Sequence, residues 1–401
     1  MKIKDLTWVL APGILYLMRY LASVNILLVV IAVIPLLIVI GLYLPNVRSF
    51  FKISTYGMIN LFLLSLMIYS VLNSYTRSVI VFFLLMLYPH AIIGNENVSI
   101  DRLNKLSKQF GIGILLIFLI AIFIPLITSY PYSIGAWYYI ASDEISTISS
   151  TLDGPILLII IVIFTLKILI NKFPRIHYVI GCLIILSFSF YSLLVFNRRI
   201  VIFVYLILIP LIVLKFDRNR SLYTSIFIST FLVPLFFGLI LSFANDFFSI
   251  PFIKDFTLRT GDLDQSRNQR LIGWTYALSE FQNTSLKDFF GFQKELIRSN
   301  IDRYNHFHNG YIQMFYEQGI FGISVLVGLI IQLLKRIKYY SYIDVKKHIY
   351  VLIPPLIFGV ILIISITEST FQRLSVANLV FIFMGFMILK TSESIKNKIN
   401  E

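Results

Sequence analysis

The chain has 401 residues, of which 58% are hydrophobic and 13% are charged, and its formal net charge is +14 at pH 7. A soluble globular domain has about 25% charged residues. The composition therefore excludes a soluble protein whose whole surface faces water. The apolar residues occur in long runs rather than in the alternating pattern of an outer-membrane barrel. Because a helix satisfies its own backbone hydrogen bonds in lipid, the sequence predicts an all-α polytopic membrane protein.

Apolar runs near the length of a bilayer span, roughly 17–25 residues, recur along the whole chain. We predict twelve spans, at residues 6–22, 24–44, 53–72, 79–94, 110–128, 155–170, 178–196, 200–214, 222–244, 310–334, 349–366 and 376–389. Pro12 and Arg19 interrupt the first run, so the predicted count is eleven or twelve. No small-residue cleavage site follows this run, and we expect it to be a retained span rather than a signal peptide. The single cysteine excludes an intrachain disulfide.

One connection between the predicted spans is much longer than the others. It divides the chain into N-terminal transmembrane helices at residues 1–245, a large periplasmic loop with short helices at 246–309, and C-terminal transmembrane helices at 310–401. If both ends of the chain are cytoplasmic, the whole net charge of +14 falls on the cytoplasmic side. This distribution follows the positive-inside rule, so the basic charge reports orientation and not nucleic-acid binding.

Lysines and arginines are sorted differently between the two predicted sides. Most lysines are cytoplasmic, where a mobile point charge is enough to meet anionic headgroups, whereas most arginines are external. The planar guanidinium group can bind a carboxylate or a phosphate through two parallel hydrogen bonds. We therefore expect an outer face that handles anions. For any single arginine, pairing with an external acidic residue is an equal alternative.

Two histidines are predicted to face outward, where the large loop re-enters the membrane. His306 and His308 lie in the segment Asn-His-Phe-His-Asn-Gly at residues 305–310. Histidine titrates nearest to neutral pH and is the usual general base, although an interfacial histidine can also be a simple anchor at the bilayer edge. Two histidines at i and i+2 without cysteine or an acidic cluster lack the ligands of a zinc site, and we expect no metal here.

The span after this segment contains two further signals. Gly319 and Gly322 have the i, i+3 spacing that lets another backbone approach a membrane helix closely. Glu317 lies nine residues after His308, which is about half a turn around a continuous helix, so the two are not spaced as a dyad. We expect Glu317 to pair with a neighbouring helix and to be functional, because acids in spans are costly.

An amphipathic stretch at residues 267–281 is predicted to lie on the membrane surface as a helix. Arg267 and Arg270 lie in its first turn, where the helix dipole favours anions over cations. A bound anion at that helix end would remove the conflict. Pairing with Asp262 and Asp264 is the alternative, and a metal at these aspartates is a weaker one.

Two short outer turns also contain arginines. The turn Asn-Arg-Arg at residues 197–199 places Arg198 and Arg199 near the bilayer edge, and the last outer turn, at residues 368–373, ends in Arg373. The first pair could instead extend to lipid phosphates.

Together these patterns resemble the bacterial O-antigen polymerase/ligase family, which are glycosyltransferases of the cytoplasmic membrane. The resemblance rests on His308-Asn309, nine residues and Gly-x-x-Gly after a long loop that has Arg270 before an amphipathic helix. The arginine turns at Arg199 and Arg373 are similar to those of the family as well. The resemblance covers the whole topology, with specific residues from about 190 to 375. The family turn usually has one arginine after Ser or Thr, whereas here Asn197 precedes two, and we favour Arg199 as the counterpart.

The resemblance implies an inverting, metal-independent glycosyl transfer from an undecaprenyl-diphosphate-linked donor, without a cofactor, on the periplasmic side of the bacterial inner membrane. In this hypothesis His308 takes the proton of the acceptor hydroxyl, while Arg270 and Arg199 bind the diphosphate leaving group. The remaining candidates are assigned to substrate binding: Arg198, Arg267, Arg373, His306, Asn309 and Glu317.

The predicted function is an O-antigen or surface polysaccharide polymerase that joins lipid-linked repeat units. One alternative is a ligase that moves finished glycan to lipid A–core, and another is a transporter or flippase for lipid-linked oligosaccharide. The transporter is disfavoured because the spans have few central charges and the two halves show no repeat. Expected partners are an undecaprenyl-diphosphate-linked oligosaccharide and membrane lipids, with a chain-length regulator and a flippase as further candidates and no nucleic acid.

Overall fold

A computed structural model describes residues 3–24, 26–72, 75–94, 98–127, 138–141, 144–147, 160–161, 163–164, 275, 309–344, 347–366, 371 and 376–400. The predicted spans at residues 178–196, 200–214 and 222–244 lie outside the described residues. So does the large loop, apart from Thr275 and Asn309. The chain divides into two compact units, Met1–Phe164 with Thr284–Glu401, and Thr165–Asn283. Every helix and strand named below belongs to the first unit.

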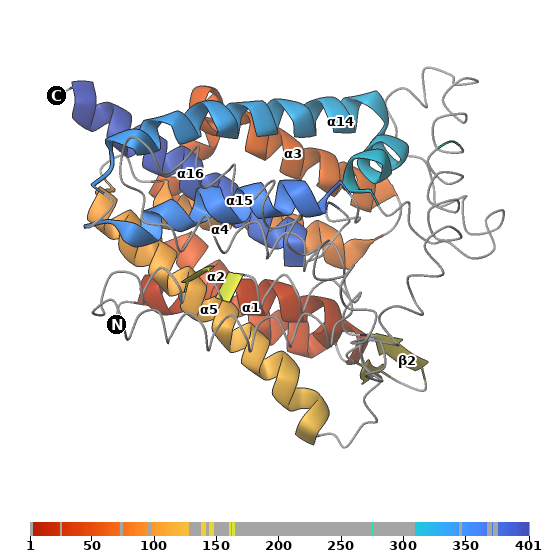
Figure 1. Ribbon diagram of the computed structural model, residues 1–401. Coiled ribbons are helices and arrows are strands. Elements are labelled where there is room, and N and C mark those ends of the chain that lie inside the picture. The colour runs from red at the N-terminus through yellow and green to blue at the C-terminus, as the bar shows by residue number, and fades with distance from the viewer. Residues whose placement is uncertain are drawn as a thin grey trace, which may run out of the picture. The chain divides into compact units, whose positions relative to one another are not determined.

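The described residues of the first unit are almost entirely helical, which agrees with the predicted fold class (Figure 1). Their bounds are α1 Ile3–Val24, α2 Ile26–Leu42, α3 Ile53–Leu72, α4 Thr76–Ile93, α5 Ile100–Ile127, α14 Gly310–Ile337, α15 Ile353–Ile364 and α16 Val376–Asn400. Short 3-10 helices are η1 Leu44–Phe51, η6 Lys338–Tyr342 and η7 Ile349–Leu352. One antiparallel hairpin, which the sequence did not predict, pairs β1 Tyr138–Ala141 with β2 Glu144–Thr147.

Three helices in the described part of the chain are long and apolar enough to cross a membrane: Ile53–Leu72, Gly310–Tyr342 and Ala377–Asn400. Shorter apolar helices cover Val33–Leu42, Ser78–Ile93 and Ile349–Ile364. The bounds of α3 coincide with the predicted span at 53–72, and α14 begins at the predicted residue 310. The total of twelve spans stays a prediction.

The helix α16 lies in the centre of the unit and packs against helices from both ends of the chain. It contacts α1, α3, α4, α5, α14 and α15. Phe381 near its start lies against the rings of Phe62, Phe358 and Phe371 at centroid distances of 5.9, 5.6 and 5.1 Å. The part of α16 up to Leu389 is apolar on nearly all sides, which suits such a central position. The N-terminal and C-terminal helices therefore share one core.

The helix α1 is continuous through Pro12, although its sequence predicted the weakest span. It packs closely on α5, where a Cβ atom added to Gly113 would lie 2.1 Å from the carbonyl oxygen of Val9. Trp8 also donates its indole N–H to the carbonyl oxygen of Leu106 at 2.9 Å. Contacts with α5 thus compensate for the proline, and it is Gly113 that permits the close backbone approach.

The hydrogen bonds identify two ends of this bundle. At one end, Arg336 in the last turn of α14 donates to the carbonyl oxygen of Ser54, and Ser394 in α16 donates to that of Val98. At the other end, the first residue of α14, Gly310, donates its N–H to the carbonyl oxygen of Ser365, just after α15. Figure 1 shows both chain termini on the side opposite to the start of α14. We refer to these as the terminal end and the Asn309 end.

Candidate functional site

The start of α14 is fixed by Asn309, the residue that follows the predicted general base. Asn309 has extended dihedral angles, and its side-chain oxygen accepts hydrogen bonds from the N–H groups of Tyr311 and Ile312, both at 3.0 Å. Its Nδ2 group donates to the carbonyl oxygen of Ile366 at 2.9 Å. Asn309 is therefore a helix N-cap that also joins α14 to the end of α15. The predicted contact between Asn309 and substrate stays a prediction.

Neighbouring groups strengthen the junction between α14 and α15. The N–H group of Gly310 donates to the carbonyl oxygen of Ser365 at 2.8 Å. The hydroxyl of Tyr311 donates to the carbonyl oxygen of Leu362 at 3.1 Å, and its ring meets Phe371 edge-on at 5.7 Å. The entry point of the chain into the membrane helix is thus held from two sides. This junction was not predicted, because its partners are more than fifty residues away in sequence.

Glu317 lies in the first segment of α14, two turns inside the helix. It accepts a hydrogen bond from Nε2 of Gln313, one turn earlier in the same helix, at 2.5 Å. This contact is made within α14, and the predicted pairing of Glu317 with a neighbouring helix stays a prediction. Because α14 begins at Gly310, the helical spacing from His308 to Glu317 does not apply. The predicted role of Glu317 in substrate binding stays a prediction.

The helix α14 is broken at Gly319. This residue has φ 63° and ψ −162°, a conformation that side-chain-bearing residues rarely adopt, and the two parts of α14 meet there at a kink (Figure 1). The break lies about 14 Å along a helix that begins at the Asn309 end, given a rise of about 1.5 Å per residue. Backbone groups freed inside a membrane must be satisfied by protein or water, so broken spans are typically found at functional sites.

Gly319 and Gly322 of the Gly-x-x-Gly pattern have different structural roles. A Cβ atom at Gly322 would lie 2.3 Å from the Cβ atom of Gln318 and 3.0 Å from its Oε1. At Gly322 the missing side chain makes room for Gln318 of the same helix, and the predicted close approach of another backbone stays a prediction. Gln318 is fully buried, and neither polar atom of its amide has a hydrogen-bond partner among the described residues. Such buried unpaired amides are rare in folded proteins.

The remaining predicted site residues are outside the part of the chain that the structure describes. They are His308, His306, Arg198, Arg199, Arg267, Arg270 and Arg373. Their predicted roles stay predictions. The described part of the predicted site is the Asn309 end of α14 with its cap, the pair Gln313–Glu317 and the break at Gly319.

At the terminal end, a second polar group surrounds His90 in α4. Its Nδ1 atom lies 2.7 Å from Oγ of Ser49, and its Nε2 atom lies 3.1 Å from Oδ1 of Asn60. The Nδ2 group of Asn60 donates to the carbonyl oxygen of Phe50, so Oδ1 is the acceptor and His90 donates from Nε2. Ser49 then donates to Nδ1. Both ring nitrogens are used in joining η1 to α3 and α4, which indicates a structural histidine.

Next to His90, a buried ion pair joins Lys390 and Glu393 of α16 at 2.9 Å. The carboxylate of Glu393 also lies 3.7 Å from Nζ of Lys52 and accepts a hydrogen bond from the hydroxyl of Tyr56 at 3.4 Å. Lys390 is fully buried, so its charge depends on this pair. Lys390 lies just beyond the predicted span 376–389, and its burial in the protein could not be predicted from the sequence.

A third charged group connects the first turn of α1 to α5. The carboxylate of Asp5 is buried and pairs with Arg102 and, at 2.9 Å, with Lys105. Burial by itself would raise the pKa of the Asp5 carboxyl, but the hydrogen bonds and charges of Arg102 and Lys105 outweigh it and lower the pKa to about 2. Asp5 therefore stays ionised and stabilises the α1–α5 contact.

The geometry defines a helical membrane bundle with a capped and broken span at one end. Comparison with protein families then shows that residues 181–327 match the model of a family described as O-antigen ligase. This match confirms the resemblance to the O-antigen polymerase/ligase family, whose members are glycosyltransferase-like membrane proteins. The matched residues include Arg199, Arg270 and His308, and they extend into α14 beyond Gly322. Among curated proteins, none matches the chain.

Proposed function

We propose that this chain is an O-antigen or surface polysaccharide polymerase. It transfers an undecaprenyl-diphosphate-linked glycan to another lipid-linked repeat unit on the periplasmic face of the inner membrane. The observation that supports this proposal most is the family match over residues 181–327, because that segment includes the predicted base and both predicted diphosphate ligands. The charge distribution supports the orientation, since a cytoplasmic terminal end follows the positive-inside rule.

The proposed reaction is a single displacement at the anomeric carbon of the donor. His308 accepts the proton of the acceptor hydroxyl, and the oxygen forms the new glycosidic bond with inversion. The bond from the anomeric carbon to the diphosphate oxygen breaks at the same time, and undecaprenyl diphosphate leaves with its electron pair. Arg270 and Arg199 stabilise the negative charge that develops on the leaving group. No metal is needed, because the two guanidinium groups supply the positive charge.

The capped start of α14 supports the assignment of the base. Asn309 is fixed to α14 through two N–H groups and to Ile366 through its amide, so the peptide unit next to His308 is anchored at a junction of two membrane helices. A general base acts efficiently only when its position is restrained near the acceptor proton. An anchor directly after His308 provides this restraint from the C-terminal side.

Replacing His308 by alanine tests the proposal. General-base catalysis contributes about 10²–10⁴ in rate, so His308→Ala should reduce polymer formation at least about a hundredfold. The measurement is the ladder of glycan lengths made by a deletion strain that expresses each variant. His348→Ala is the matched control, because His348 lies at the terminal end and should leave the ladder unchanged. A normal ladder from His308→Ala would contradict the proposed base.

Replacing Arg270 by lysine tests the proposed diphosphate contact separately. Lysine keeps the charge but loses the planar fork that binds a phosphate through two hydrogen bonds, so activity should fail. Full activity of Arg270→Lys would refute diphosphate binding by this residue while leaving the assignment of His308 intact.

A ligase that transfers finished glycan to lipid A–core is the second candidate, because the matched family model is described as O-antigen ligase and does not distinguish the two enzymes. Both enzymes use the same donor chemistry. Deletion of the gene distinguishes them, since loss of a ligase leaves all glycan off the lipid core, whereas loss of a polymerase leaves single repeat units attached.

A further inference from the structure

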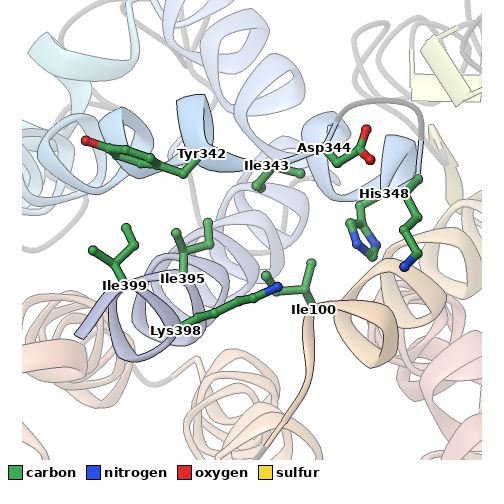
Figure 2. A pocket seen from close by; sticks show the side chains of 9 residues that line it. Ile100, Tyr342, Ile343, Asp344, His348, Ile395, Lys398 and Ile399 are labelled. Carbon is green, nitrogen blue, oxygen red and sulfur yellow. The ribbon is translucent and has the colours of Figure 1, made fainter. Parts of the chain in front are cut away.

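A cavity of about 420 Å³ lies at the terminal end of the bundle, opposite to the Asn309 end. Its walls come from η6 and the segment that follows it, from the last turns of α16, and from Ile100 at the start of α5 (Figure 2). These elements are distant in sequence and converge only in the folded unit. Neither the proposed reaction nor the family match, which ends at residue 327, involves this cavity.

The cavity has basic groups on its lining. Lys347, His348 and Lys398 contribute to it, and Figure 2 shows the side chain of Lys398 extended along the cavity toward Ile100. Both lysines are exposed, and neither forms an ion pair with any described residue. His348 differs, because its Nδ1 atom lies 3.4 Å from the carboxylate of Asp101. The two lysines are therefore the charges that are available to an anion.

One acidic residue, Asp344, also lines the cavity. In Figure 2 its carboxylate points away from the side chain of Lys398. The carboxylate of Asp344 therefore does not neutralise the positive charge of Lys398.

The rest of the lining is apolar and partly open. Tyr342 and Ile399 expose 67% and 52% of their surfaces, whereas Ile395 and Ile343 are buried. A soluble phosphate compound would gain nothing from these side chains. A molecule with a phosphate group and attached hydrocarbon would bury them and meet the lysines at the same time.

The depth of the cavity in the membrane agrees with such a ligand. The apolar helix Gly310–Tyr342 ends at the cavity, so Tyr342 is the last residue of a candidate span. The part of α14 after the break at Gly319, residues 320–337, is about 27 Å long, which is close to the hydrocarbon core of about 30 Å. The end of this part therefore lies near a headgroup layer, and the cavity beside η6 lies at the level of the headgroups. Tyrosine and lysine are enriched at this level.

We propose that this cavity binds an anionic phospholipid of the phosphatidylglycerol class. Lys347 and Lys398 contact the headgroup phosphate, and the first carbons of the acyl chains lie against Tyr342, Ile395 and Ile399. Mobile ammonium groups suit this contact, because lipid phosphates in a fluid membrane present no fixed geometry. The lipid would join η6 to the last turns of α16. This inference depends only on the position of α14 in the membrane and does not rest on the proposed function.

The test uses the full chain, purified in a neutral detergent and stripped of lipid. Binding of a fluorescent phosphatidylglycerol is measured and is then competed with unlabelled phosphatidylglycerol, phosphatidylcholine, glycerol 3-phosphate or inorganic phosphate. We expect competition by phosphatidylglycerol alone. The double variant Lys347→Gln/Lys398→Gln should bind at least about tenfold more weakly, since each lysine near a headgroup contributes about fivefold. Lys347→Arg/Lys398→Arg should retain binding, because it keeps both charges.

The matched control is Lys396→Gln/Lys338→Gln, which removes the same charge from α16 and η6 at residues that do not line the cavity. Its affinity should stay within about twofold of the unmodified protein. Equal weakening in the control would overturn the proposal, because it would indicate attraction to the whole basic face. Equal competition by phosphatidylcholine, or by inorganic phosphate alone, would overturn it as well. Far-UV circular dichroism and gel filtration confirm that each variant is folded.

Discussion

Replacing Asn309 by alanine removes three hydrogen bonds from the junction at which the chain enters α14. Two of them cap the helix through the N–H groups of Tyr311 and Ile312, and the third joins Asn309 to the carbonyl oxygen of Ile366. Loss of an N-cap of this type costs about 1 kcal/mol. A carbonyl oxygen that loses its donor adds about 1–3 kcal/mol, and the lower value applies here because Ile366 is 53% exposed. The free energy of unfolding should therefore fall by about 2 kcal/mol.

The variant Asn309→Asp separates the two contributions. A carboxylate still accepts from Tyr311 and Ile312, and its charge is favourable at a helix N-terminus, but it cannot donate to Ile366. We expect this variant to lose about 1 kcal/mol or less. The measurement is urea unfolding in mixed micelles, followed by far-UV circular dichroism. If the alanine variant is as stable as the unmodified protein, or no less stable than the aspartate variant, then Asn309 is not the structural cap that the geometry indicates.

The same pair of variants bears on function. If Asn309 acts only as a cap, the aspartate variant should retain most of its polymer ladder. If Asn309 also contacts substrate, the aspartate variant should lose activity while it remains folded.

Three further predictions concern stability. Gly319→Ala should destabilise the protein by about 1–3 kcal/mol, because alanine at φ 63° is strained; a gain in stability on urea unfolding would show that the break is not preserved in the membrane. Glu393→Leu should cost about 3–5 kcal/mol by leaving Lys390 buried and unpaired, and Lys390→Met in the same chain should restore most of it; no recovery in the double variant would contradict the pairing. The pKa of Asp5 is lowered in the folded state, so its contribution of about 2 kcal/mol is present above about pH 4 and is lost as the pH falls toward 2. Asp5→Asn should remove this part of the acid dependence, and an unchanged pH profile of unfolding would refute the role of Asp5.

The predictable part of the fold is the part that depends on local apolar runs. The span at 53–72 and the start of α14 at residue 310 were predicted at the correct residues, because polar residues bound each run. The helix α1 was expected to be the weakest span, since a sequence does not show that Gly113 of α5 would pack against the backbone of Val9. The hairpin β1–β2 has no strong alternating pattern and was missed.

The contacts of the candidate site depend on distant partners and were less predictable. Asn309 before a helical run is a recognisable cap signal, but its bond to Ile366 links segments 57 residues apart. Gly319 follows two polar residues, Glu317 and Gln318, but this local pattern alone does not distinguish a break from a polar turn of a continuous helix. Gly322 is predicted to serve helix packing because small residues usually have that function in membranes, and the sequence does not show that it also makes room for Gln318.

The most direct measurement of the central claim is polymerisation by the purified protein. The full chain in detergent is mixed with an undecaprenyl-diphosphate-linked repeat unit, without any ion gradient and with a metal chelator present. We predict that longer lipid-linked chains form, that undecaprenyl diphosphate is released in equal amount, and that His308→Ala abolishes both. An unmodified protein that leaves the repeat unit unchanged, or a His308→Ala variant that elongates it at the normal rate, would contradict the proposed function.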